Sequence, residues 1–208
     1  MTAPAAWALC RIRSPRLPLL QGRARLAGLV AGCGIAALGI ATALQAGLGV
    51  GPYDVLVDGL ARRVGVTFGV ASLGLGAVFV LAGRALGGPV GLGTVVVVAL
   101  VGPLVDAWRL VVPEPATVAL QLGQLAVAVA IIAVGLGLMI AARLGVGPME
   151  VVMLGLADRG VPLRWLRTAM EVGVAATGWA LGGSIGLGTI VIALTLGHAL
   201  AAVIPRQA

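Results

Sequence analysis

Long runs of residues without a charged side chain constrain this chain more than any other feature. Residues 26–46 are uncharged, and comparable apolar stretches recur along the rest of the sequence. The hydrocarbon core of a bilayer is about 30 Å thick and is crossed by about 20 apolar residues in a helix. The sequence therefore predicts an all-α, polytopic transmembrane helical bundle with six spans, at residues 26–46, 66–83, 92–112, 117–142, 162–182 and 187–204.

The composition excludes most other classes of protein. Hydrophobic residues make up 60% of the chain and charged residues only 10%, whereas a soluble domain carries about 25% charged residues. Cys10 and Cys33 form no disulfide framework and no metal-ligand spacing. The sequence contains no set of residues typical of nucleophilic or metal-dependent catalysis. We therefore expect no enzyme activity, no cofactor and no metal.

The chain also contains an internal repeat. Residues 46–55 return as residues 142–151, a shift of 96, and residues 85–94 return as residues 180–189, a shift of 95. Such self-similarity indicates a duplicated structural unit. We expect three spans and one short helix in each unit. The predicted division is a basic cytoplasmic tail (1–24), repeat 1 (25–112), a central turn (113–116), repeat 2 (117–204) and a C-terminal cytoplasmic tail (205–208).

The placement of the arginines predicts the orientation. Cytoplasmic loops collect Lys and Arg, and with a cytoplasmic N-terminus and six crossings eleven arginines lie inside and three outside. The net charge of +7 is thus explained by topology, and no nucleic-acid partner is expected. Three crossings per repeat place the second repeat upside down relative to the first, as in many transporters. The expected location is the inner or plasma membrane, with both termini cytoplasmic.

The two segments that follow the first and fourth spans leave an alternative open. If they also crossed the membrane, the chain would have eight spans and parallel repeats, with only Arg84 and Arg143 outside. Residues 52–63 would form a helix about 18 Å long at 1.5 Å per residue, which is too short to cross. We therefore interpret the segments as re-entrant or interfacial half-helices, and an amphipathic helix at the membrane surface explains their pattern equally well.

Each short segment begins with glycine and proline followed by an acidic residue. The first copy has Gly51, Pro52 and Asp54, and the second has Gly147, Pro148 and Glu150. Proline suits the first helical position, and the free N–H groups of that turn favour a negative charge. One interpretation is that each carboxylate serves only its own helix end. Ionisable groups near the hydrocarbon are costly and usually functional, however, so all six residues are candidates for binding a solute or ion.

Three further residues complete the candidate site. Glu171 lies one helical turn after Arg167 in the fifth predicted span, where it is a candidate proton or cation relay. Thr94 and Thr189 open the third and sixth spans within Gly-Leu-Gly-Thr, and such hydroxyls can form hydrogen bonds across helices.

Two other ionisable residues are assigned structural roles. Asp106 is expected to form an interfacial ion pair with Arg109, next to Trp108 as an aromatic anchor. His198 in the sixth predicted span is expected to be a hydrogen-bonded packing residue.

The sequence resembles one known family. Leu-Gly-Val-Gly-Pro-Tyr-Asp-Val-Leu at residues 48–56, the following Gly-Leu-x-x-Arg and the Gly-Leu-Gly-Thr elements look like those of the YczE/YitT-type bacterial integral membrane proteins. In that family a Gly-x-Gly-Pro-Trp-Asp box follows the first span. Here Tyr53 stands at the tryptophan position, and the second copy has Met149. The resemblance covers about residues 24–204 and implies membrane transport or export as the class of function.

These features favour a small secondary transporter or exporter of a small solute, coupled to protons or cations. Its expected partners are the lipid bilayer and the transported solute or ion, and self-association into a homo-oligomer is left open. The alternative is a non-transporting accessory or regulatory protein that binds another membrane protein. A channel is a weaker third interpretation, because the sequence shows no ring of pore-lining polar residues.

Overall fold

The computed structural model describes residues 23–194, and all the regular secondary structure in this range is helical. The all-α prediction is confirmed for these residues. Seven helices have defined ends, and an eighth begins at residue 187 and is followed to residue 194. Both predicted tails (except for residues 23 and 24), His198 and the second half of the sixth predicted span lie outside the described residues. The seven helices are α1 (Arg23–Ala46), α2 (Pro52–Val64), α3 (Phe68–Ala85), α4 (Leu92–Arg109), α5 (Val118–Ala142), α6 (Pro148–Ala157) and α7 (Leu163–Ala180).

Four of these helices, α1, α3, α4 and α5, are long and apolar enough to cross a membrane. They correspond to the first four predicted spans, with ends that differ by at most three residues. The fifth predicted span is α7, which has 18 residues but carries Arg164, Arg167 and Glu171 and is not among the four. The structure thus supports a membrane protein with at least four apolar helices of spanning length, and the count of six remains a prediction.

The two predicted half-helices are present and are short. Helix α2 has 13 residues and α6 has 10, which correspond to about 20 and 15 Å of helix. Both begin with proline after a glycine in extended conformation, and α2 ends at Gly65, whose φ of 77° is left-handed. Most of α2 is buried by the protein, and only its last turn is exposed. It therefore lies within the bundle and not along its surface.

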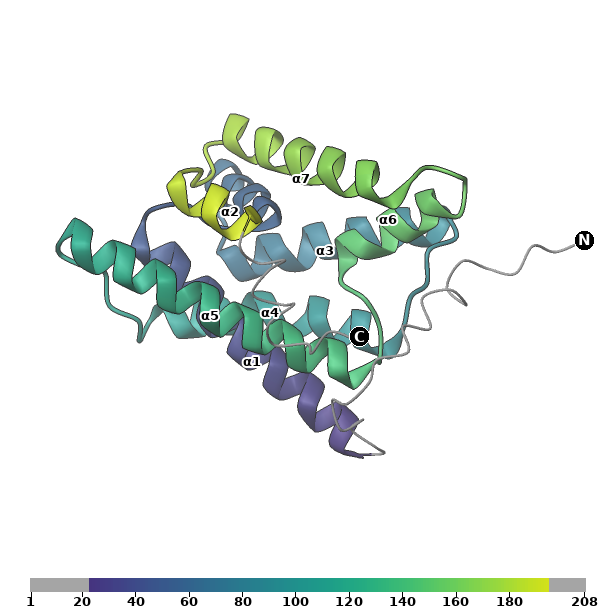
Figure 1. The fold of residues 1–208 in the computed structure, drawn as a ribbon, viewed down its shortest axis with the longest axis horizontal. Coiled ribbons are helices and arrows are strands. Elements are labelled where there is room, and N and C mark those ends of the chain that lie inside the picture. The colour runs from purple at the N-terminus through teal and green to yellow at the C-terminus, as the bar shows by residue number, and fades with distance from the viewer. Residues whose placement is uncertain (1–22, 195–208) are drawn as a thin grey trace, which may run out of the picture.

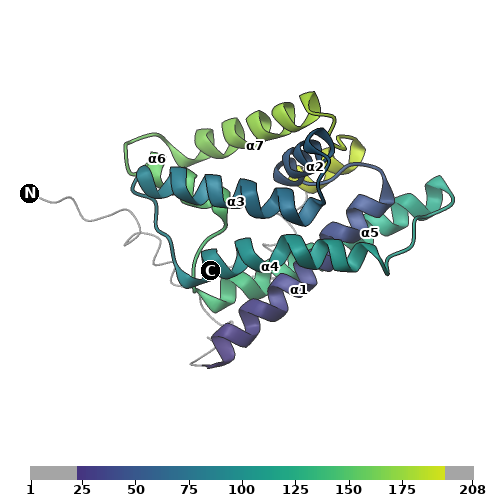
Figure 2. The same cartoon turned by 180° about the vertical axis from the view of Figure 1, so that it is seen from behind.

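The helices form two layers (Figures 1 and 2). Helices α1, α4 and α5 lie together in one layer, and α2, α3, α6 and α7 form the other. Helix α3 packs against α4 and joins the layers. A cluster of small and apolar side chains from α1, α2, α3 and α4, centred on Val57, Phe68 and Val105, fills the space between them.

The equivalent helices α1 and α5 run antiparallel and pack closely. Gly32 of α1 faces Met139, whereas Gly39, further along α1, faces Ile132, which precedes Met139 in α5. A Cβ atom added at Gly39 would lie 2.8 Å from the backbone nitrogen of Ile132. Glycine at these positions lets the two backbones touch. Gly32 and Gly39 therefore serve the packing of α1 against α5.

The short helices are exchanged between the two repeats. Helix α2 of repeat 1 packs against α7 of repeat 2, and α6 of repeat 2 packs against α3 of repeat 1. The contacts are equivalent: Gly178 of α7 faces the backbone of Leu56, and Gly83 of α3 faces the backbone of Val152. Each half therefore completes the packing of the other.

Candidate functional site

The two glycine-proline bends are held by the opposite repeat. The Gly93 N–H donates to the carbonyl oxygen of Leu144 at 2.8 Å, and the Gly188 N–H donates to that of Leu48 at 2.7 Å. Leu48 and Leu144 occupy equivalent positions just before the two bends. The Gly-Leu-Gly-Thr element of each repeat thus fixes the bend of the other.

Thr94 and Thr189 belong to these contacts. Both are buried. The Thr94 hydroxyl accepts hydrogen bonds from the N–H groups of Gly91 at 3.4 Å and Val146 at 3.3 Å. The Thr189 hydroxyl accepts one from Gly186 at 3.2 Å and lies against Gly49 of the other repeat. Because backbone donors occupy both hydroxyls, these two threonines position the bends.

Each bend presents its acidic residue in the same way. The Asp54 carboxylate folds back over Gly51, where an added Cβ atom would lie 3.0 Å from Oδ2. The Glu150 carboxylate covers Gly147 in the same manner. As N-cap residues, Gly51 and Gly147 provide no side-chain hydrogen bond to their helices. The acids occupy the positive ends of their own helices, where a negative charge is favoured.

Burial governs the protonation of both acids, which lie outside the four spanning helices. Burial, with the neighbouring charge of Asp58, raises the pKa of Asp54 to about 7. Burial also raises the pKa of Glu150, against the opposing effects of its backbone hydrogen bond and of Arg167. Glu150 also keeps an exposed surface. Asp54 is only partly exposed and can exchange a proton near neutral pH.

Tyr53 links the acids of the two repeats. Burial raises the pKa of its hydroxyl, and the charges of Asp54 and Glu150 raise it further. The ring packs edge-on against Phe79 of α3, with centroids 5.7 Å apart. The hydroxyl is buried and has no hydrogen-bond partner among the described residues. A buried unpaired hydroxyl is unusual and points to a ligand or water.

Glu171 lies on α7 within the electrostatic reach of Glu150. Its carboxylate pairs with Arg167 at 2.9 Å, as the spacing in the sequence suggested. The charges of both residues act on the pKa of Glu150, Arg167 lowering it and Glu171 raising it. We call Tyr53, Asp54, Glu150, Arg167 and Glu171, which are linked by these electrostatic influences and by the Arg167–Glu171 ion pair, the acidic cluster.

The sequence did not identify a second polar region, around Asp58. Only 5% of this residue is exposed, and its carboxylate accepts hydrogen bonds from Arg62 Nε at 3.0 Å and from the Ser184 N–H at 2.9 Å. The guanidinium of Arg62 also donates to the Ser184 hydroxyl at 2.9 Å. The four-residue spacing of Asp58 and Arg62 was visible in the sequence, but their partner Ser184 lies in the other repeat and was not.

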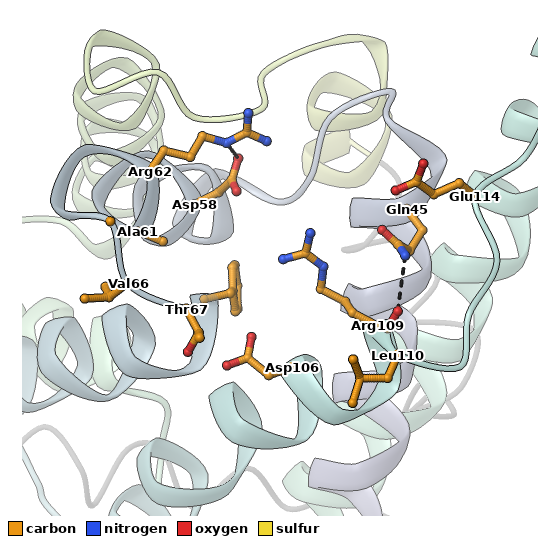
Figure 3. Close-up of a pocket in the computed structure, with 12 residues that line it drawn as sticks. Gln45, Asp58, Ala61, Arg62, Val66, Thr67, Asp106, Arg109, Leu110 and Glu114 are labelled. Carbon is orange, nitrogen blue, oxygen red and sulfur yellow. Dashed lines mark hydrogen bonds and ion pairs between the residues drawn. The ribbon is translucent and has the colours of Figure 1, made fainter.

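An open pocket of about 610 Å³ lies beside Asp58 and Arg62 (Figure 3). Its wall includes Gln45, Asp106, Arg109 and Glu114. The expected ion pair between Asp106 and Arg109 is not found among the described residues. Asp106 Oδ2 instead accepts a hydrogen bond at 2.9 Å from the N–H of Gly69, in the first turn of α3, where free N–H groups attract a carboxylate.

Trp108 is partly buried against α1. Its indole nitrogen donates to the Gly34 carbonyl oxygen of α1 at 3.1 Å. This bond ties the end of α4 to α1, and the role of the half-buried Trp108 as an aromatic anchor stays a prediction.

Comparison with known proteins identifies the family of this chain. Residues 23–205 match the model of a family of unknown function, DUF6198. The chain belongs to this family. It is 29% identical to the uncharacterized membrane protein YczE of Bacillus subtilis, over 85% of this chain and 84% of that protein. It is also 25% identical to an uncharacterized protein of Haemophilus influenzae, over 78% and 75% of the respective chains. The YczE-type resemblance is thus confirmed, and no solved structure matches.

Proposed function

We propose that this membrane protein is a secondary transporter of a small solute, coupled to protons through the acidic cluster. One arrangement carries the proposal: two equivalent bends, each held by the opposite repeat, place Asp54 and Glu150 at helix starts. Tyr53, next to Asp54, has a buried hydroxyl without a partner among the described residues. Transporters commonly bind substrate where discontinuous helices of two repeats meet. A carboxyl group that titrates near neutral pH suits proton coupling.

The transport model uses the two repeats in opposite orientations. The antiparallel packing of α1 and α5 and the exchanged positions of α2 and α6 support it, because a two-fold axis perpendicular to these helices inverts one half. Alternating access would then be a rocking of one half against the other around the acidic cluster. In this proposal both termini are cytoplasmic, and the chain is not an enzyme.

Flux measurements test the proposal directly. The full chain is reconstituted in liposomes that contain a pH-sensitive dye, and candidate solutes are added outside. We expect at least one solute to move protons across the membrane and to exchange with its labelled form inside. If no solute in a broad panel of small cations, zwitterions and anions is carried, while a partner membrane protein purifies with the chain, the accessory function replaces transport.

Cysteine labelling tests the inverted arrangement. Arg63 and Asp158 lie at the exposed ends of the two short helices, where a cysteine side chain is accessible. With Cys10 and Cys33 replaced by serine and alanine, we expect Arg63→Cys to react with an impermeant maleimide from outside the cell. Asp158→Cys should react only after the membrane is opened. Protection of both positions would indicate eight spans and parallel repeats.

A further inference from the structure

The pocket of Figure 3 contains two charged side chains without a partner among the described residues. The guanidinium of Arg109 and the carboxylate of Glu114 make no hydrogen bond or ion pair among the described residues, although both line the pocket. Figure 3 shows the Arg109 side chain extending into the pocket, with Glu114 beside Gln45 on the far side from Asp106. Because these two opposite charges line one pocket and do not pair with each other, each can bind a ligand group of the opposite charge.

The other polar groups in the wall are already engaged. Asp58 is paired with Arg62, and one oxygen of Asp106 accepts the Gly69 N–H. Gln45 donates to the carbonyl oxygens of Arg109 at 3.3 Å and Val112 at 3.2 Å. Gln45 therefore fixes the end of α4 and the turn that leads to Glu114. The backbone around the two free charges is held in place, which favours binding.

The charged side chains that line the pocket favour a ligand with both a positive and a negative group. An anion without a positive group would meet the carboxylates of Asp106 and Glu114, and a cation without a negative group would meet Arg62 and Arg109. A zwitterion satisfies both sets, because guanidinium binds a carboxylate or phosphate in a two-pronged manner and a carboxylate binds an ammonium group. The volume of about 610 Å³ lies within the usual range for small-molecule sites.

We propose that this pocket binds a small zwitterion, with its acid anion on Arg109 and its primary ammonium group on Glu114. As the substrate class of a transporter this inference rests on the proposed function, whereas the binding itself does not. Asp58 connects the pocket to the acidic cluster, since it lies one helical turn from Asp54 and its charge acts on that residue. The same chemistry occurs in free amino acids and in ethanolamine phospholipid headgroups, and the experiment separates these sources.

The test is the melting temperature of the purified full chain in detergent, with alanine, phosphoethanolamine, propionate or ethylamine. Propionate and ethylamine each keep one of the charged groups of alanine. We expect at least one zwitterion to raise Tm by about 3–5 °C at a concentration about ten times its Kd, and the single-charge probes to have little effect. A response to alanine indicates a free solute, and a response to phosphoethanolamine alone indicates a lipid headgroup.

Variants locate the binding. Arg109→Gln and Glu114→Gln should each abolish the rise in Tm, because both side chains are exposed and unpaired and their loss leaves the fold intact. Arg63→Gln is the matched control, since Arg63 is exposed on α2 and does not line the pocket. Equal stabilisation by propionate or ethylamine, a response retained in Arg109→Gln, or no response to either zwitterion would overturn the proposal. Binding without flux in liposomes would retain the site and reject transport.

Discussion

The Asp54→Asn variant is expected to lose proton-coupled flux by at least about tenfold, the scale on which a positioned acid or base contributes to proton transfer. Burial and Asp58 raise the pKa of Asp54 to about 7, so this carboxyl group can take up and release a proton within the physiological range. An amide has nearly the same shape and cannot exchange the proton. Initial rates of dye-reported proton movement in liposomes, measured from pH 5 to pH 8, provide the comparison.

The matched control is Asp158→Asn, because Asp158 is exposed at the end of α6 and belongs to neither the acidic cluster nor the pocket. Glu150→Gln should resemble Asp54→Asn, since Glu150 occupies the equivalent position in repeat 2. If the double variant Asp54→Asn with Glu150→Gln kept wild-type flux and its pH dependence, both acids would be removed from the mechanism.

The pH dependence of stability also tests the protonation of Asp54. A carboxyl group whose pKa is raised from 3.8 to about 7 by folding binds more protons in the folded state than in the unfolded state between these values. Its contribution therefore lowers stability as pH rises through that window. The Tm of the wild type should fall relative to that of Asp54→Asn between about pH 4 and pH 7, and an opposite trend would show that Asp54 is ionised in the fold.

Much of the fold could be predicted from local signals. The apolar runs predicted α1, α3, α4 and α5 with ends that differ by at most three residues, because burying twenty apolar residues in a bilayer leaves few alternatives to a helix. The glycine-proline pairs predicted the starts of α2 and α6, since proline fixes φ at the first helical position. These features depend on residues that are close together in the sequence.

Contacts between distant residues could not be predicted in this way. A helix along the membrane surface was one of two interpretations of residues 52–63, but Asp58 in this helix is buried and accepts a hydrogen bond from Ser184 of the other repeat. Asp106 was paired with Arg109 on the basis of proximity in the sequence, and it instead caps α3 through Gly69. Tyr53 was noted only as a replacement for tryptophan, whereas its hydroxyl is buried without a partner among the described residues. The sequence therefore identifies candidate polar residues, but their partners are determined by the tertiary packing of distant segments.

The largest effect on folding is expected from adding a single methyl group where the repeats exchange their short helices. In Gly178→Ala the new Cβ atom would lie 2.5 Å from the backbone nitrogen of Leu56, and in Gly83→Ala it would lie 2.7 Å from that of Val152. Backbone cannot move aside as a flexible side chain can, so α2 or α6 must shift. Overpacking of this kind costs about 1–3 kcal/mol, and we expect Tm to fall by roughly 2–12 °C.

The same two helices supply the controls. Gly74 of α3 and Gly173 of α7 have no atoms within 4 Å of an added Cβ atom, and alanine is the better helix former by up to about 1 kcal/mol. Gly74→Ala and Gly173→Ala should therefore leave Tm unchanged or raise it. Size-exclusion profiles and melting curves of the four variants in detergent separate the pairs. If all four variants had the same Tm and the same elution profile, α2 and α6 would not pack on the opposite repeat. The acidic cluster would then lose its structural basis.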